Sequence, residues 1–311
     1  MNDLVKSDCW KEEWRARIGG GRAAAAAGIH EYMTRYELYR SMVEEVEMDL
    51  SENPNLLRGI LLEPVCMQRL QMLHPDLHFE AHDQNQFVYN PAYPFASDLP
   101  DLHVSLNRKS LPVQCKVPTP ENWQRLEFEI PDYIRANCVH SVAVNGSESI
   151  LLACLNPVTM EVFQSVITPS QQEIDCLMSA EERFWINHIV PRIPPPLKTS
   201  NDIKLRWPDH VPGLSKVATP DIEDICSELR SAKAASKRQQ EQIDELTDAV
   251  KVFMEDAEIL LPEDGNKPLA TWRTQTARVF DTAAFKKDHP QAAKEYYIDR
   301  DSRVFLVKKP S

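Results

Sequence analysis

The stretch PDLHVSLNRKSLPVQCKV, residues 100–117, contains two short apolar runs separated by turn-forming residues. Leu102–Leu106 and Leu111–Val117 have the length and the bounding residues of β-strands. Asn107–Ser110 lies between them and supplies the polar residues that favour a turn. The stretch therefore predicts a β-hairpin.

Strand alternation divides the side chains of the second strand into two sets. Val113, Cys115 and Val117 would point into the core, and Gln114 and Lys116 would share the opposite face. The second strand thus presents two polar side chains next to each other on one surface.

An acidic residue, Asp101, opens the first strand of the same hairpin. Carboxylate oxygens hold hard cations such as Mg²⁺, and a nearby lysine orients or activates water and neutralises charge on a phosphate. Asp101 followed by Gln114 and Lys116 therefore matches the arrangement with which several nucleases build a magnesium site. Taken alone, the pattern also fits a surface hairpin with a solvated lysine.

Sequence periodicity on both sides of the hairpin predicts a chain of mixed helix and strand. Thr34, with Glu37 three residues later, has the spacing of a capping box and predicts the start of a helix. Further helices are predicted from about residue 22 and over 56–73, 133–144 and 170–190, and strands are predicted over 77–81 and 149–155.

A heptad pattern dominates the C-terminal third. Its alternating spacings of three and four residues define an apolar seam, made of Ile222, Ile225, Leu229, Ala232, Ser236, Gln239, Ile243, Leu246, Val250, Phe253, Ala257 and Leu260. An unbroken helix over the seam would be about 58 Å long at about 1.5 Å per residue. Ser236 and Gln239 weaken its middle, so a bent helix or a helical hairpin is the alternative. The seam predicts association with a second copy or a partner, or packing against the rest of the chain.

These patterns suggest three segments. We expect a first domain at 1–212, the heptad segment at 213–261 and a small α/β tail at 262–311 with strands over 269–273 and 303–308. No apolar run approaches the roughly 18 residues that cross a bilayer, and the N-terminus lacks the pattern of a secretory signal. We therefore expect a cytoplasmic protein with no membrane association.

Cysteine and histidine spacings give no strong metal signal. The cysteines are Cys9, Cys66, Cys115, Cys138, Cys154, Cys176 and Cys226. No two of them have C-x-x-C spacing, so we predict buried, reduced thiols. His74, His78 and His82 have the spacing of a metal ladder on a helix, but the alternation of this segment favours a strand instead.

Three further motifs occur in a fixed order around the hairpin. They are Ile18–Gly21 (IGGG), Arg58–Val65 (RGILLEPV) and Tyr133–Val144 (YIRANCVHSVAV). In this order they resemble the YqaJ-like viral recombinase family, relatives of lambda exonuclease within the PD-(D/E)xK nuclease superfamily. The resemblance covers about residues 8–210 and extends more loosely to the tail. It implies an α+β or α/β fold with a restriction-endonuclease-like core, in which helices flank a mixed sheet.

The resemblance also implies a catalytic set. Glu63 matches the glutamate of the family's Gly-x-x-x-Glu pattern, Asp101 the metal-binding aspartate and Lys116 the catalytic lysine. Gln114 occupies the position of the second acidic ligand. Glu63, Asp101, Gln114 and the main-chain carbonyl of Cys115 would then hold Mg²⁺, for which Mn²⁺ can substitute.

A second implied set concerns DNA. Gly21 lies where relatives often have a serine that holds the terminal phosphate, and Arg15 or Arg17 would supply the nearby guanidinium. Asn137 stands where relatives carry a glutamine, and Arg35 completes the expected DNA-binding set.

The chain departs from the family pattern at three places. Gln114 is neutral where a carboxylate is expected, and Gly21 lacks the hydroxyl. Asp101 is followed by Leu102 instead of glycine, so Asp98 remains an alternative ligand. The net charge of −12 also differs from the basic excess typical of DNA-binding proteins, although a local basic groove would still suffice because salt confines surface fields to about 10 Å.

The resemblance implies a Mg²⁺-dependent exonuclease that resects linear double-stranded DNA from its 5′ ends. Its partners would be duplex ends, a single-strand annealing protein and further copies of itself in a ring or coiled coil, within the host cytoplasm if a phage encodes it. One alternative is a nuclease-fold protein with a weakened or inactive site that binds DNA ends or a protein. Another is a scaffold organised by the heptad helix.

Overall fold

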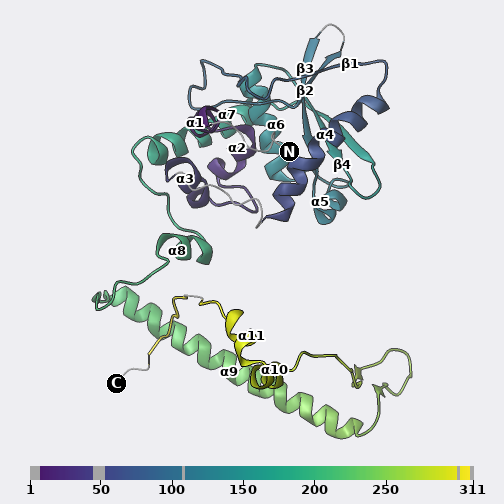
Figure 1. Cartoon of the computed structure of the whole chain (residues 1–311), viewed down its shortest axis with the longest axis vertical. Coiled ribbons are helices and arrows are strands. Elements are labelled where there is room, and N and C mark those ends of the chain that lie inside the picture. The colour runs from purple at the N-terminus through teal and green to yellow at the C-terminus, as the bar shows by residue number, and fades with distance from the viewer. Residues whose placement is uncertain (1–7, 45–52, 107–108, 300–301, 309–311) are drawn as a thin grey trace. The chain divides into compact units, whose positions relative to one another are not determined.

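The computed structural model (Figure 1) describes residues 8–44, 53–106, 109–299 and 302–308. The chain divides into two units, residues 1–206 and 207–311. The finer boundaries at 212 and 261 stay predictions.

In its described part, the first unit is built on a five-stranded mixed sheet. The strands are β1 His78–Ala81, β2 Leu102–Leu106, β3 Lys109–Lys116, β4 Ile150–Leu155 and β5 Val162–Ile167. They lie in the order β1-β2-β3-β4-β5, and only the β3–β4 pair among them is parallel. The β2–β3 pair is the predicted hairpin, in which Leu102 lies opposite Val113.

Helices flank this sheet (Figure 1). They are α1 Asp8–Arg15, α2 Gly20–Ala27, α3 Arg35–Val43, α4 Pro54–Leu73, α5 Pro120–Arg125, α6 Asp132–Asn145 and α7 Gln171–Phe184, with a π-helical turn over Trp185–Ile189. Helix α8 Ser200–Arg206 follows, and its Asp202 accepts from the hydroxyl of Thr34, the N-cap of α3. Helix α4 packs on β3 and β4, α6 also contacts these strands, and α2 packs against α6 and α7. The mixed sheet flanked by helices confirms the predicted fold class.

The side chains on the two faces of β3 lie in different environments. Val113 and Cys115 are fully buried in a cluster with Cys66 and Leu70 of α4, as the alternation predicts. On β4, Leu152 and Cys154 instead pack in a second cluster with α6 residues. Because Gln114 lies opposite Leu152 in the register, the polar face of β3 is turned toward α6.

Local sequence signals account for several helix ends. The Thr34 hydroxyl accepts from the Glu37 N–H and the Glu37 carboxylate accepts from the Thr34 N–H, which confirms the capping box. Asn53 caps α4 and Pro54 occupies its first turn, where a missing N–H costs nothing. Gly146, with φ of 64°, ends α6 in the left-handed conformation that favours glycine. Val46, which follows Met42 at a helical interval in the sequence, lies outside the described residues.

The second unit contains α9 Pro220–Met254, β6 Ile259–Leu260, β7 Ala270–Thr271, α10 Thr282–Asp288 and α11 Pro290–Glu295. The heptad segment is one 35-residue helix, so the helical hairpin is excluded. It ends at Met254 because Glu255 adopts a φ of 48°, and Ala257 and Leu260 are therefore not helical. The expected strand over 269–273 shortens to Ala270–Thr271, and the strand expected over 303–308 is wrong.

Other expectations meet mixed outcomes. Cys66, Cys115, Cys138 and Cys154 are buried free thiols, whereas Cys9 and Cys176 are exposed, so burial was wrong for those two. Within the described ranges, no three His, Cys, Asp or Glu side chains lie close enough together to hold a metal ion. His74, His78 and His82 therefore do not form a metal site there. No helix in these ranges is long and apolar enough to cross a membrane.

Candidate active site

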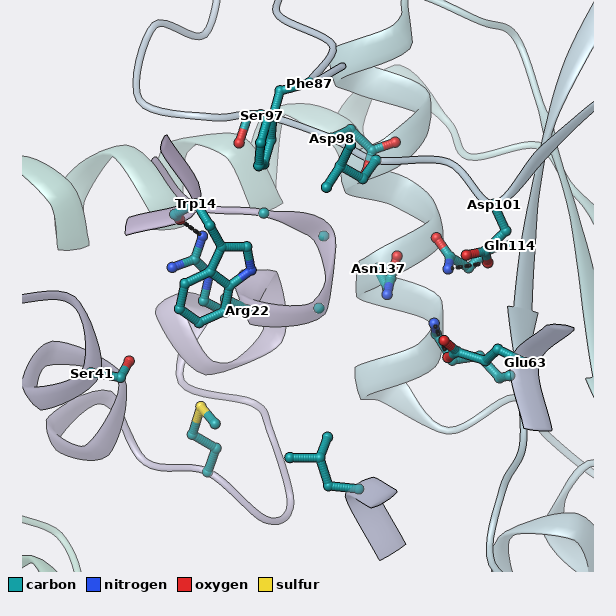
Figure 2. Close-up of a pocket in the computed structure, with 17 residues that line it drawn as sticks. Trp14, Arg22, Ser41, Glu63, Phe87, Ser97, Asp98, Asp101, Gln114 and Asn137 are labelled. Atoms are coloured by element: carbon teal, nitrogen blue, oxygen red, sulfur yellow. Dashed lines mark hydrogen bonds and ion pairs between the residues drawn. The ribbon is translucent and has the colours of Figure 1, made fainter. Parts of the chain in front are cut away.

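Residues from both the hairpin and its surrounding motifs line one pocket of about 330 Å³ (Figure 2). Its lining includes the three glycines Gly19, Gly20 and Gly21 and the polar side chains of Arg22, Ser41, Glu63, Ser97, Asp98, Asp101, Gln114, Lys116 and Asn137. In Figure 2, Glu63, Asp101 and Gln114 lie on one side of the pocket, and Trp14 and Arg22 lie on the other. Segments far apart in sequence therefore meet here.

Hydrogen bonds connect the four residues of the expected catalytic set in two pairs. The Lys116 Nζ donates to the Glu63 Oε1 at 3.3 Å, which links β3 to α4. The Gln114 Nε2 donates to the Asp101 Oδ2 at 2.7 Å, and the Cys115 N–H donates to the same oxygen at 2.7 Å. Asp101 is thus held against β3 by one side chain and one main-chain amide.

The environment of Asp101 disfavours its charged form. Burial raises the pKa of Asp101 to about 7, with a further increase from Glu63, while Lys116 and the Cys115 N–H act in the opposite direction. A carboxyl with this raised pKa holds a proton near neutral pH more readily than an ordinary aspartate does. A cation placed beside it would remove that proton.

Lys116 behaves in the opposite way. Burial alone would lower the pKa of Lys116, but Glu63 and Asp101 outweigh it and raise the pKa above its usual value. The ammonium group is therefore charged throughout the physiological range. Lys116 can stabilise negative charge on a phosphate or hold a water by donation, but it does not serve as a proton acceptor there.

The oxygen ligands in this pocket fit a hard divalent cation, although they include one carboxylate fewer than the family pattern because Gln114 replaces an acidic residue. Glu63 and Asp101 offer carboxylate oxygens and Gln114 offers an amide oxygen, which are ligand types that Mg²⁺ accepts. The Cys115 N–H points to Asp101, and a role for the Cys115 carbonyl stays a prediction.

Asp98 lines the same pocket but has different partners. Its Oδ2 accepts from the Ser141 hydroxyl and from the Asn145 Nδ2, the latter at 2.7 Å. Both donors are on α6, so Asp98 ties the segment before β2 to this helix. Asp101, and not Asp98, accepts from Gln114 and Cys115, which favours Asp101 of the two alternatives.

A buried ion pair between His140 and Glu181 fixes the segment that contains Ser97 and Asp98. The His140 Nδ1 contacts both Glu181 carboxylate oxygens at 3.0 Å, and its Nε2 contacts the Ser97 carbonyl at 3.0 Å. Burial lowers the pKa of His140, but Glu181 outweighs it and raises the pKa to about 9. The charged imidazole therefore donates to both partners and holds α6, α7 and residue 97 together.

The glycines place the N-terminus of α2 at the pocket. Gly19 is its N-cap and provides no side-chain acceptor, so the first amides of α2 lack a side-chain cap. A Cβ at Gly20 would lie 2.7 Å from the Asn137 Oδ1 and 3.2 Å from the Asp98 Oδ1, whereas a Cβ at Gly21 would meet nothing within 4 Å. Gly20 thus leaves space for the Asn137 and Asp98 side chains beside α2, and position 21 has room for the serine that relatives often carry there.

Arg22 lines this pocket and is not among the residues predicted for the site. Its guanidinium is buried, lies 3.9 Å from the centre of the Trp14 ring and donates to the Trp14 and Arg17 carbonyls. The Nε and Nη1 atoms have no hydrogen-bond partner, and burial lowers the pKa of Arg22 to about 9. The signal in the sequence was one basic residue at the start of a run of five alanines.

The remaining expected DNA-binding residues lie differently. Asn137 lines the pocket, and its Oδ1 is buried without a hydrogen-bond partner. Arg17 pairs with Glu13, and the Arg35 Nε and Nη2 donate to carbonyls at the end of α2. Arg15, Arg17 and Arg35 are not among the lining residues, so their contact with DNA stays a prediction.

Comparisons with known proteins give one full-length relative and several structures. The uncharacterized protein YqaJ of Bacillus subtilis (strain 168) is 23% identical over 317 residues, spanning 100% of this chain and 97% of that protein. An alkaline exonuclease from Laribacter hongkongensis is 15% identical with a TM-score of 0.48, covering 60% of this chain and 94% of that one. Its complex with dAMP is 13% identical with a TM-score of 0.49, covering 64% and 97%.

A family model matches part of the chain. The model of the YqaJ-like viral recombinase domain matches residues 9–148. This range contains the glycine turn, the glutamate motif, the hairpin and α6. The resemblance in the sequence is thereby confirmed: residues 9–148 are similar to the YqaJ-like viral recombinase domain, and the whole chain is similar to YqaJ.

Proposed function

We propose that this protein is a metal-dependent DNA nuclease that resects linear double-stranded DNA from its 5′ ends, and that it supplies single strands to an annealing protein. The observation that carries this proposal is the meeting of Glu63, Asp101, Gln114 and Lys116 in the pocket at the N-terminus of α2. Metal-dependent hydrolysis of a phosphodiester uses acidic groups that hold the cation and a positive charge that faces the phosphate, and this pocket brings both together.

In this proposal Glu63, Asp101 and Gln114 hold Mg²⁺ or Mn²⁺ through their oxygens. When bound, such a cation lowers the pKa of a water ligand and polarises the phosphate. Lys116, kept charged by Glu63 and Asp101, stabilises the negative charge that develops on the phosphate as water attacks phosphorus and the sugar oxygen leaves. The Gln114 and Cys115 donors keep Asp101 oriented toward the same point.

The opposite side of the pocket supports binding of the DNA terminus. The first amides of α2 point out of the helix with the positive end of its dipole, which favours an anion such as a terminal phosphate. Arg22 adds a positive charge beside these amides, although its guanidinium is covered by Trp14. Gly21 leaves the space in front of them open.

A second candidate function is binding without cleavage. The Gln114 amide satisfies Asp101 by a hydrogen bond that requires no cation. A protein that held DNA ends through α2 and did not cut them would keep the same pocket.

The two functions are separated by incubating the purified protein with end-labelled linear duplex and with a covalently closed circle, each in Mg²⁺, Mn²⁺ or chelator. We expect metal-dependent loss of the linear DNA and survival of the circle. Binding of linear DNA without loss in either metal would reject the nuclease and select the second function.

A further inference from the structure

We propose that α9 pairs with α9 of a second copy of this chain in a parallel, two-stranded coiled coil. Helix α9 has 35 residues and is about 52 Å long at about 1.5 Å per residue. It is the long green helix of Figure 1. This inference does not depend on the nuclease proposal, because it rests on a different unit of the chain.

The apolar seam is left open in the second unit. Ile225, Ile243, Leu246 and Phe253 are 54–76% exposed in the described residues. Leu229 is half-buried. A helix that is 35 residues long and exposes its apolar side chains along one line needs a second apolar surface of the same shape and length.

The types of residue on the seam select a two-stranded partner. Heptad positions a are occupied by Ile222, Leu229, Ser236, Ile243 and Val250. Three of these five are β-branched, and Ile243 is followed by Leu246 at position d, the combination that favours parallel dimers. A second copy supplies the same seam, which is the simplest complement to it.

The d positions agree with an in-register pair. They are Ile225, Ala232, Gln239, Leu246 and Phe253. In a parallel pair each of these lies against itself, so Gln239 meets Gln239 and two amides satisfy each other across the seam. A polar side chain inside the seam costs stability and specifies the register.

Charge complementarity separates the parallel orientation from the antiparallel one. In a parallel pair Glu228, at position g, lies beside Lys233, at position e of the second copy, and this contact occurs twice. No like charges meet at the other e and g positions, which hold Asp221, Ala235, Gln242 and Ala249 at g and Cys226, Gln240, Thr247 and Met254 at e. In a fully overlapped antiparallel pair Glu228 and Lys233 would face uncharged residues instead.

An ion pair within one chain lies on the outer face of α9. Lys237 pairs with Glu241 at 3.5 Å, and both side chains are well exposed. This pair lies on positions b and f, away from the apolar seam. The polar face therefore stays in water when the seam closes.

The first test is the mass of the full chain in solution by light scattering over a range of concentrations. We expect twice 35.6 kDa for the wild type and the single-chain mass for Ile243→Asp. Ala234→Asp is the matched control, because it adds the same charge on the outer face, and it should leave the dimer intact. A single-chain mass for the wild type, or a larger assembly that Ile243→Asp leaves unchanged, would overturn the proposal.

The second test fixes the orientation and does not depend on a destabilised variant. In a background with Cys9, Cys176 and Cys226 changed to serine, Leu246→Cys should form an intermolecular disulfide on oxidation, and the outward-facing Asp248→Cys should not. An antiparallel pair would place position 246 beside Leu229 of the second copy. A dimer that gives no disulfide through Leu246→Cys would therefore contradict the parallel arrangement.

A charge exchange tests the proposed ion pairs directly. Lys233→Glu places like charges beside Glu228 and is expected to raise the dissociation constant of the dimer several-fold. Adding Glu228→Lys to the same chain should restore the dissociation constant. Failure of the second change to compensate for the first would show that the two residues do not meet.

Discussion

Replacing Gln114 with glutamate restores the carboxylate that the family pattern contains and tests what the amide now does. The Gln114 Nε2 donates to the Asp101 Oδ2 at 2.7 Å, and a hydrogen bond to a charged acceptor contributes about 1.5–3 kcal/mol. Gln114→Glu removes this donor and puts a second negative charge beside Asp101. Two carboxylates about 4 Å apart repel by about 4 kcal/mol at an effective dielectric constant of about 20.

The pair can reduce this cost by keeping a proton. Because the pKa of Asp101 is already about 7, holding a proton at pH 7 costs little, and a shared proton replaces the lost hydrogen bond in part. We therefore expect a net loss of about 2 kcal/mol at pH 7, growing by about 1.4 kcal/mol for each pH unit above it. At about 2–4 °C per kcal/mol, the melting temperature should fall by about 4–8 °C.

Added Mg²⁺ or Mn²⁺ should reverse this loss, because two carboxylates hold a divalent cation more strongly than a carboxylate and an amide. The assay is thermal unfolding of the wild type and Gln114→Glu in chelator and in metal, at pH 7 and pH 8.5. Gln124→Glu, an exposed glutamine on α5, is the matched control and should respond to neither pH nor metal. The metal concentration for half-maximal cleavage should also be lower for Gln114→Glu.

Two results would refute this reasoning. Gln114→Glu with wild-type stability in chelator at both pH values would show that the bond to Asp101 contributes little. If the wild type already saturates at low Mg²⁺ and Gln114→Glu loses cleavage, then the glutamine is a working ligand in its own right.

Three further outcomes are expected. Glu63→Gln should reduce cleavage by orders of magnitude, as for parts of a site that act together, while circular dichroism shows an intact fold. Gly20→Ala should destabilise the protein by about 1–3 kcal/mol through its clash with α6, whereas Gly21→Ala should lose nothing, and denaturant unfolding compares the two. Since the pKa of His140 rises from 6.5 to about 9 on folding, its contribution of about 3 kcal/mol is present below pH 6.5 and is lost as pH rises through 9. His140→Gln should flatten that pH dependence of stability.

Each of these outcomes has a clear opposite. Normal cleavage by a folded Glu63→Gln protein would show that Glu63 is not part of the catalytic set. Equal stabilities for Gly20→Ala and Gly21→Ala would show that α2 moves away from α6 at little cost. An unchanged stability of the wild type between pH 6.5 and 9 would contradict the raised pKa of His140.

The parts of the fold that sequence predicted best are those with a short, strict period. The bounds of β2 agree with the prediction to the residue, because alternation and flanking turn residues both limit the strand. The capping box at Thr34 is equally local, since three residues supply both hydrogen bonds. Such features depend on neighbours in sequence, which is why they are readable there.

The parts that were missed depend on contacts between distant segments. Val162–Ile167 forms the edge strand β5, whose side chains are only partly buried, so its apolar pattern is weak. The heptad pattern continues to Leu260, but the backbone turns at Glu255 and ends the helix earlier. Arg22 stands in an alanine-rich helix, where an arginine usually faces solvent, and its burial follows from the Trp14 ring that covers it.

The candidate site shows the same division. The order of the motifs was enough to bring Glu63, Asp101, Gln114 and Lys116 together. The hydrogen bonds that favour Asp101 over Asp98 as the proposed ligand come from β3 for Asp101 and from α6 for Asp98, and the sequence did not show them.

The central claim is that this pocket hydrolyses DNA with a divalent cation, and Lys116 tests it most directly. Cleavage of 5′-labelled linear duplex is measured against Mg²⁺ and Mn²⁺ concentration for the wild type and for Lys116→Ala, with melting temperatures recorded for both. We expect metal-dependent cleavage by the wild type and a loss of orders of magnitude in a folded Lys116→Ala protein. Equal cleavage by the two proteins, or none by the wild type at any metal concentration, would contradict it.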